Sequence, residues 1–280
     1  MSSLAVTAPA SPKRAAGGIG PAYRSHLAAL SRAFDGPFTA ADAAPVLTVD
    51  RATASRITGY LASRGWLARV RRGLYVPVPL EATTPGEWRA DPWLVAAHVF
   101  EPCYIGGWSA CEHWGLTEQL FREVLVVTAR PQRRSAARVQ GGDFHVVVRQ
   151  PGALFGTRPV WRGRERVDVS DPSRTAVDLL DDPVIGGGIR HVADVVAEYF
   201  AGEHRNDDRL LAYVERLGNR TVFKRLGYLL EALEIDAREL IEVCFERKSA
   251  GISPLDPSID TKGKITRRWS LRVNAKVSPA

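Results

Sequence analysis

The chain has 280 residues, of which 45% are hydrophobic and 25% are charged, and its formal net charge is +7. A chain of this length and composition can bury a substantial core, and its length favours about two domains. No stretch approaches the roughly 18 consecutive apolar residues that a membrane-spanning helix needs, so we expect no transmembrane segment.

The first 20 residues are rich in Ala, Ser, Pro and Gly. They lack the continuous apolar region of a secretory signal peptide, and their first basic residues, Lys13 and Arg14, come too late in the chain for one. We therefore expect residues 1–20 to be a disordered leader and the protein to be cytoplasmic.

Residues 21–80 are expected to form a small domain that begins with helices. Apolar and polar positions alternate with helical spacing over residues 23–34, and the Asp-Gly-Pro sequence at residues 35–37 ends this first helix. Thr39 is a candidate N-cap for a short second helix over residues 40–47.

A third helix is expected to separate its residues into an inward and an outward face. Asp50 occupies the N-cap position, and the helix runs from residue 51 to about residue 64, where Gly65 ends it. The inward stripe recurs at i, i+3 and i+7 and consists of Ala54, Ile57 and Leu61. At about 100° per residue, the outward positions are Arg51, Ala52, Ser55, Arg56 and Gly59, with Thr53 near the edge of the core.

A β-hairpin is expected to follow the third helix. Residues 66–70 and 74–77 have the composition of strands, and Arg71-Arg72-Gly73 between them forms a basic turn. Three helices followed by a hairpin is the order of elements in a winged helix-turn-helix domain. The two turn arginines would then meet the minor groove of DNA or its flanking phosphates.

The charge of the chain is concentrated in this first domain. Residues 1–80 contain ten of the 38 basic side chains but only three of the 31 acidic ones, so the remainder of the chain is balanced. Charge confined to one domain is typical of polyanion binding. On the third helix, Arg51 and Arg56 can reach base edges or phosphates, Thr53 can reach a phosphate, and small residues such as Ser55 permit close approach to the major groove. The expected partner is double-stranded DNA.

Residues 81–91 contain Thr-Thr-Pro-Gly and are expected to link this domain to a larger one over residues 92–280. The expected helices of the larger domain are 93–100, 109–114, 172–180, 189–200, 207–217 and 220–233, and a helix is favoured over a strand at 236–247. The expected strands are 104–105, 124–128, 144–149, 159–161, 166–169 and 269–273. The fold class is therefore α+β, with an N-terminal winged helix-turn-helix and a larger mixed α/β domain whose C-terminal part is helical.

The sequence predicts no enzyme, cofactor or metal site. Cys103, Cys111 and Cys244 form no CxxC pair, and their odd number argues against a disulfide framework. Cys111 and His113 are two residues apart, but no second pair at zinc-finger spacing completes a set of four ligands. The phosphate-binding and nucleophile motifs G-x-x-x-x-G-K, G-x-G-x-x-G and G-x-S-x-G are all missing from the sequence.

The sequence permits two further functional interpretations. Glu246-Arg247-Lys248 has the E-x-K spacing of metal-dependent nucleases, which would need a further acid such as Asp168, Asp171 or Asp178. Its simpler interpretation is an exposed helix end, where basic residues interact favourably with the helix dipole. The other alternative is a stand-alone transcriptional regulator whose second domain senses a ligand or a partner.

Five blocks of the sequence resemble the AbiEi family. They are TASRITGYLASRGWLARVRRGLYVPVP (53–79), YIGGWSACEHWGL (104–116), DPSRTAVDLLDDP (171–183), NRTVFKRLGYLLEAL (219–233) and LDPSIDTKGKITRRWSLRVN (255–274). Their order and spacing cover nearly everything from about residue 20 to residue 275, which makes the match fairly specific. The leader lies outside the resemblance.

The resemblance implies a type IV antitoxin encoded beside a nucleotidyltransferase toxin. In such a pair, the N-terminal winged helix represses the shared promoter at inverted repeats, and the second domain supplies the antitoxin activity through residues that the resemblance does not identify. The family's DNA-contact positions correspond here to Arg51, Thr53, Ser55 and Arg56 on the recognition helix and to Arg69, Arg71 and Arg72 on the wing.

Overall fold

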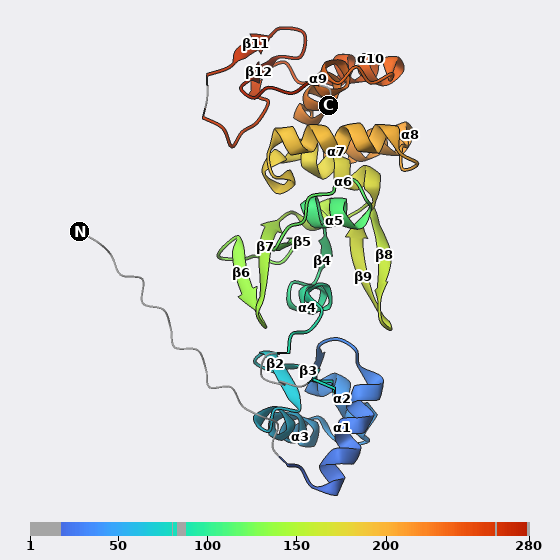
Figure 1. Ribbon diagram of the computed structural model, residues 1–280, viewed down its shortest axis with the longest axis vertical. Coiled ribbons are helices and arrows are strands. Elements are labelled where there is room, and N and C mark those ends of the chain that lie inside the picture. Colours follow the sequence, from blue (N-terminus) through green and yellow to red (C-terminus); the bar gives the residue numbers. More distant parts are fainter. Residues whose placement is uncertain (1–17, 80, 83–87, 261, 279–280) are drawn as a thin grey trace, which may run out of the picture. The chain divides into compact units, whose positions relative to one another are not determined.

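The computed structural model describes residues 18–79, 81–82, 88–260 and 262–278 (Figure 1). Within this part of the chain the fold is α+β, as predicted, with ten α-helices and three β-sheets. Most of the expected leader and the centre of the expected linker, residues 1–17 and 83–87, lie outside the described residues.

The chain divides into two compact units. The first extends to His98 and includes the short segments 139–141 and 163–165, and the second contains the remaining residues. Helix α4 (Pro92–Val99) ends at the boundary between them.

Three helices open the first unit where the sequence predicts them. They are α1 (Pro21–Ala33), α2 (Ala40–Leu47) and α3 (Arg51–Ser63). The predicted N-caps are confirmed. The backbone N–H of Asp42 donates to the Thr39 hydroxyl, while the Asp42 carboxylate accepts from the Thr39 backbone N–H at 2.8 Å, which completes a capping box. At α3, the Asp50 carboxylate accepts from the backbone N–H of Thr53 at 2.9 Å.

The hairpin of the first unit belongs to a three-stranded antiparallel sheet. Its strands are β1 (Phe38–Thr39), β2 (Leu67–Arg71) and β3 (Leu74–Pro77), in the order β1-β3-β2. Gly73 in the turn has a φ of 78°, a left-handed conformation that glycine adopts without the steric penalty of a side chain. The hairpin was predicted, whereas the two-residue strand β1 was not.

One core holds the helices and the hairpin of this unit together. Leu30 of α1, Ala54 and Leu61 of α3, Phe38 of β1 and Leu67 of β2 are all buried in it. Fully burying a Leu or Phe side chain contributes roughly 1.5–3 kcal/mol. The hairpin is thereby fixed to the same core as α3.

The second unit is built on a mixed six-stranded sheet in the order β6-β7-β5-β4-β9-β8. Its strands are β4 (Cys103–Ile105), β5 (Val124–Thr128), β6 (Ala136–Val139), β7 (Gly142–Val148), β8 (Thr157–Arg162) and β9 (Glu165–Ser170). Strand β4 pairs antiparallel with β5 and parallel with β9, and β5 pairs parallel with β7. Edge strand β6 was not predicted.

Helices make up most of the rest of the second unit. They are α5 (Gly107–His113), α6 (Pro172–Asp181), α7 (Ile189–Ala201), α8 (Asp207–Leu217), α9 (Thr221–Ala232) and α10 (Arg238–Arg247), with short 3-10 turns at Pro151–Ala153 and Pro183–Gly186. The helix favoured for residues 236–247 is confirmed by α10. Helices α6 to α9 all bury apolar faces in one core.

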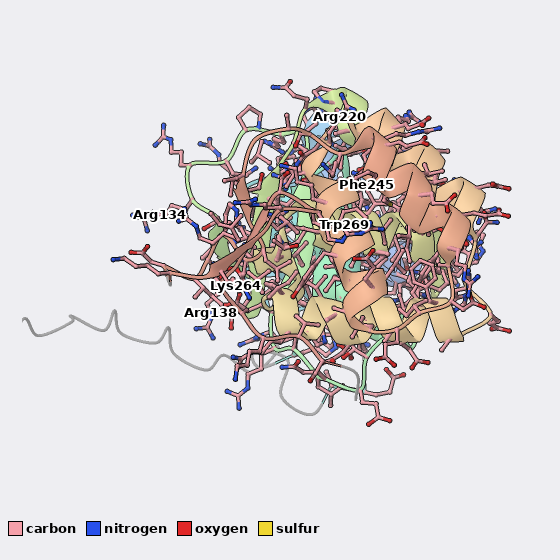
Figure 2. The ribbon with its side chains drawn as sticks, turned by 90° about the horizontal axis from the view of Figure 1, so that it is seen from above. Arg134, Arg138, Arg220, Phe245, Lys264 and Trp269 are labelled. Carbon is pink, nitrogen blue, oxygen red and sulfur yellow. The ribbon has the colours of Figure 1, made fainter. Side chains whose placement is uncertain are left out.

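A small three-stranded sheet follows α10. Its strands are β10 (Ser253–Pro254), β11 (Lys264–Thr266) and β12 (Leu271–Val273), in the order β10-β12-β11. The strand predicted at 269–273 starts only at Leu271, because Ser270 has a left-handed φ of 51° that interrupts extended backbone. Trp269, which precedes this turn, is buried and its ring packs edge-on against Phe245 (Figure 2).

Buried polar contacts join β4 and α6 in the second unit. The Arg174 guanidinium lies 2.9 Å from the Asp178 carboxylate, which also accepts a 2.8 Å hydrogen bond from the Tyr104 hydroxyl. Burial raises the pKa of Asp178, and the adjacent guanidinium opposes this effect. Breaking such a pair from one side leaves a buried charge without compensation, which typically destabilises a protein by about 3–5 kcal/mol.

Two residues of α9 contact α6 and the chain beside the strands of the C-terminal sheet. Arg225 is buried and its guanidinium donates to the backbone carbonyls of Leu180 and Leu255 at 2.7 and 3.1 Å. Gly227 faces the Trp269 ring so closely that a Cβ atom at this position would overlap it. These contacts, together with that between Tyr104 and Asp178, connect four of the sequence blocks described above. The four are the blocks at 104–116, 171–183, 219–233 and 255–274.

Candidate nucleic-acid interface

Helix α3 separates its residues as the sequence predicts. The inward residues Ala54, Ile57 and Leu61 are buried. Arg51, Ala52, Ser55 and Arg56 are exposed, whereas Gly59 is half-buried. The outward face of α3 therefore presents two guanidinium groups among small side chains, which allow a partner to approach the helix backbone.

Thr53 takes part in a chain of hydrogen bonds at the start of α3. Its hydroxyl donates to the Asp50 carboxylate at 2.7 Å and accepts from Nη2 of Arg56 at 3.0 Å. Hydrogen bonds from Thr53 hold the pKa of Asp50 below its ordinary value, so this carboxylate is ionised near neutral pH. The structure places Thr53 in the helix cap as a positioning residue for Arg56. Sequence reasoning assigned it a phosphate contact and did not foresee this arrangement.

The hairpin presents three further arginines. Arg69, Arg71 and Arg72 are exposed, and the guanidinium of Arg69 lies 5.6 Å from the ring centroid of Tyr75 on the neighbouring strand. A register shift between Arg69 and Arg71 interrupts the pairing of β2 with β3. Arg71 is the last residue of β2 and pairs with Leu74, so only Arg72 and Gly73 form the turn, which is one residue shorter than predicted.

The surface of the first unit is strongly basic. Between residues 18 and 79, all eight arginines are exposed: Arg24, Arg32, Arg51, Arg56, Arg64, Arg69, Arg71 and Arg72. Of the three carboxylates in this segment, Asp42 and Asp50 serve as helix caps. Among the described residues, no carboxylate forms an ion pair with an arginine of α3 or of the hairpin. These guanidinium groups are therefore available to an anionic partner.

Arg64 is a candidate contact that sequence reasoning missed. It lies just after α3, it is exposed, and its guanidinium lies 5.4 Å from the ring centroid of Tyr60. The signal was present in the sequence, because residues 56, 60 and 64 recur at i, i+4 and i+8 and so share one side of a helix. Tyr60 also packs against Tyr23 of α1, with ring centroids 4.2 Å apart.

The E-x-K sequence does not occupy a metal-binding arrangement. Glu246 is near the end of α10, and Lys248 is the residue that caps it. Asp171 accepts hydrogen bonds at the start of α6, and Asp178 is held by Arg174. Among the residues that the structure describes, no three His, Cys, Asp or Glu side chains are grouped as metal ligands.

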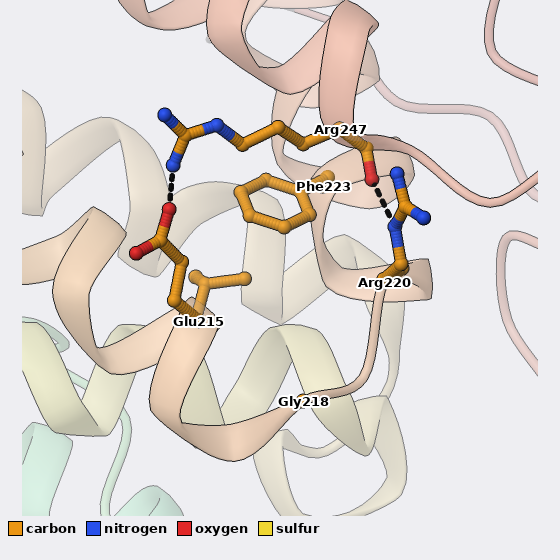
Figure 3. A pocket seen from close by; sticks show the side chains of 6 residues that line it. Glu215, Gly218, Arg220, Phe223 and Arg247 are labelled. Atoms are coloured by element: carbon orange, nitrogen blue, oxygen red, sulfur yellow. Dashed lines mark hydrogen bonds and ion pairs between the residues drawn. The ribbon is translucent and has the colours of Figure 1, made fainter.

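One pocket beside this sequence is lined by Arg247 but not by Glu246 or Lys248. It has a volume of about 340 Å³ and is lined by Val214, Glu215, Gly218, Arg220, Phe223 and Arg247 (Figure 3). The Arg247 guanidinium forms an ion pair with Glu215. The backbone carbonyl of Arg247 accepts a 2.6 Å hydrogen bond from Nε of Arg220. The pocket thus lacks the paired acid and lysine that the nuclease alternative requires.

The three cysteines are free thiols. Burial raises the pKa of Cys103 and Cys244 to about 12 and that of Cys111 still further. These thiols therefore stay protonated at neutral pH, which makes them poor nucleophiles and poor metal ligands. None of the described helices combines the length and apolar character needed to cross a membrane.

Comparisons with known proteins show similarity of fold. No family model and no curated protein matches the sequence. Among solved structures, the crystal structure of the RV2827C protein from Mycobacterium tuberculosis is similar, with 17% sequence identity and a TM-score of 0.61. The match covers 93% of this chain and 94% of that one, so both units have counterparts in a single chain of similar length.

Proposed function

We propose that this protein is a transcriptional repressor that binds promoter DNA through an N-terminal winged helix-turn-helix. The observation that carries the proposal is the set of exposed arginines on α3 and the hairpin, none of which is paired with a carboxylate among the described residues. The order of three helices and a hairpin on one core supports it.

In this proposal α3 enters the major groove, which is about 12 Å wide and admits a helix. Arg51 and Arg56 face the bases or phosphates, and Ala52 and Ser55 let the helix approach closely. The hydrogen bond from Arg56 to Thr53 uses only one of the five guanidinium N–H groups, so the others are free to contact a guanine or a phosphate. On the wing, Arg69, Arg71 and Arg72 contact the minor groove and its phosphates.

We further propose that the protein is the antitoxin of a type IV pair, whose toxin is a nucleotidyltransferase encoded nearby. The support is the resemblance of the five blocks to the AbiEi family, whose order and spacing cover most of the chain. No active-site chemistry is needed for either role.

The DNA-binding proposal is tested by a gel-shift assay with the promoter upstream of the gene. Replacing Arg56 by Ala should weaken specific binding by about 1–3 kcal/mol if its guanidinium contacts a base. An unchanged affinity would remove Arg56 from the interface.

The antitoxin proposal is tested separately by expressing the adjacent gene in a heterologous host. Growth arrest by the adjacent gene alone, and rescue when this protein is co-expressed from an unrelated promoter, would support it. Use of an unrelated promoter separates antitoxicity from repression. A harmless adjacent gene would leave a stand-alone regulator as the better proposal.

A further inference from the structure

The small C-terminal sheet carries an exposed surface that is both apolar and basic. Ile252, Ile259 and Ile265 are 57%, 37% and 43% exposed. In the register of the sheet, Arg272 of β12 lies between Pro254 of β10 and Ile265 of β11. Residues directly opposite each other on neighbouring strands lie on the same face of a sheet. We call Pro254, Arg272 and Ile265, together with the groove beside them, the C-terminal face.

The groove of the C-terminal face has a volume of about 440 Å³. Ile252, Pro257 and Ile259 contribute apolar walls, Arg272 and Asn274 contribute polar groups, and Asp260 contributes one carboxylate. Single exposed apolar residues are normal on a protein surface, but several around one groove are typical of a binding site. For comparison, a cavity of about 150 Å³ is large enough to bind benzene.

The chain around this groove is strongly basic. Residues 252–276 contain six basic side chains and two acidic ones. All six basic residues are exposed, and within the described part of the chain only Arg268 forms an ion pair, with Glu231. One of the two acids, Asp256, is buried and accepts a hydrogen bond from the backbone N–H of Ile189. The C-terminal face therefore favours a partner that is both acidic and partly apolar.

Helix α10 of the same chain carries unpaired carboxylates. It contains three acidic side chains and two basic ones, Arg238 and Arg247, and Arg247 is paired with Glu215. Glu239, Glu242 and Glu246 are exposed, and their i, i+3, i+7 spacing places them in one stripe along the helix. No basic group among the described residues forms an ion pair with any of the three. Phe245 flanks the stripe and is 43% exposed (Figure 2).

We infer that the acidic stripe of α10 in one copy of this protein docks on the C-terminal face of a second copy. The three unpaired carboxylates of the stripe complement the excess of basic side chains over residues 252–276, and both surfaces expose apolar side chains. We assign Glu242 and Arg272 as partners across this contact. Exposed isoleucines favour a protein over a nucleic acid, because interfaces with DNA are more polar than those between proteins. Each copy offers both surfaces, so a reciprocal contact produces a two-fold dimer.

Dimerisation through this contact goes beyond the proposed function and requires no DNA. Its consequence for a repressor is clear, because two inverted half-sites need two recognition helices. A dimer held together by the second units supplies both from one complex.

The test is sedimentation velocity of the full chain over a wide range of concentration, at low and high salt. We expect a dimer that dissociates on dilution and more readily at high salt. Glu242→Arg and Arg272→Glu should each weaken dimerisation by about tenfold or more, because each places like charges together at both contacts. The double variant should restore the dimer, since the pair is re-formed with opposite sign. An equimolar mixture of the two single variants should also associate, because one of its two contacts is complementary.

Arg190→Glu and Asp194→Arg on α7 are matched controls. Both side chains are exposed charges of the second unit, and no ion pair involves either within the described residues. They should leave the dimer unchanged. Circular dichroism melting curves of every variant establish that the fold is intact.

A wild-type chain that stays monomeric at all concentrations overturns the inference, as does a dimer that charge reversal at Glu242 and Arg272 leaves unchanged. If these variants instead impair binding to promoter DNA or to the purified product of the adjacent gene, while the wild type remains monomeric, the surface belongs to that other partner. A dimer that forms as expected in a protein without promoter affinity would refute the proposed function and leave this inference standing.

Discussion

Replacing Arg71 and Arg72 together by alanine should reduce both the affinity for promoter DNA and its dependence on salt. Both side chains are exposed at the end of the hairpin, and neither is paired with a carboxylate among the described residues. Their removal should therefore change the free energy of unfolding by no more than about 0.5 kcal/mol, as is usual for surface substitutions away from caps and cores. A loss of DNA binding can then be assigned to the interface itself.

The magnitude follows from the number of phosphates that the arginines neutralise. Arg51, Arg56, Arg69, Arg71 and Arg72 of one recognition unit would give a slope of log K against log salt of about −4.5, since each contact contributes about −0.9. Between about 50 and 200 mM salt, the affinity should then fall roughly 500-fold. With only three contacts left, the slope becomes about −2.7 and the fall roughly 40-fold.

The assay is fluorescence anisotropy with a labelled promoter fragment, titrated at several salt concentrations. Arg133→Ala with Arg134→Ala is the matched control, since it also removes two adjacent exposed arginines, in this case from the second unit. The control should leave the slope unchanged. An equal decrease of slope in both double variants, or none in either, would refute the assignment of DNA binding to the hairpin.

Four further substitutions test the structural basis of these interpretations. Arg174→Met leaves a buried carboxylate without its cation and should lower the free energy of unfolding by about 3–5 kcal/mol, measured by urea denaturation; a loss below 1 kcal/mol, roughly the value of a surface pair, would show that the pair is solvated. Gly227→Ala should also destabilise the protein, by about 1–3 kcal/mol, because the new methyl group overlaps the Trp269 ring. By contrast, Gly59→Ala meets nothing within 4 Å and should stabilise α3 by up to about 1 kcal/mol; the same sign for both glycines would contradict the packing. The pKa of Asp50 is lowered in the folded state, so its stabilising effect is present above the ordinary Asp pKa and is lost as the pH falls through the folded-state value. Acid unfolding followed by circular dichroism should accordingly be less steep in Asp50→Asn, and identical profiles would disprove the cap's contribution.

The elements that the sequence predicts well are those with local signals. The N-caps at Thr39 and Asp50 and the glycine in the hairpin turn each specify a backbone conformation through neighbouring residues alone. Strands β1, β10 and β11 have two or three residues each, which is too short for an alternating pattern, so they exist only because a partner strand lies beside them. Their prediction requires knowledge of the tertiary fold.

The candidate interface was predictable in its composition but not in its internal contacts. Helical spacing is sufficient to place Arg51 and Arg56 on the outward face of α3. It does not reveal that the Thr53 hydroxyl connects the cap carboxylate to Arg56, because that depends on the rotamers of three side chains. A residue three positions from both partners has the correct spacing for such a bridge, yet many threonines share this spacing without forming one.

Net charge per domain was informative for the first unit and misleading for the second. Residues 1–80 contain ten basic and three acidic side chains, so the sum represents the surface of this segment well. In the second unit the sum is near zero because residues 231–246 and 252–276 carry opposite charges that cancel in the total while occupying different elements. A balanced domain can therefore present one acidic and one basic surface, and such a domain is complementary to a copy of itself. This reasoning makes charge reversal at residues 242 and 272 the decisive experiment for the second unit, because it changes the distribution of charge and leaves the total of the double variant unaltered.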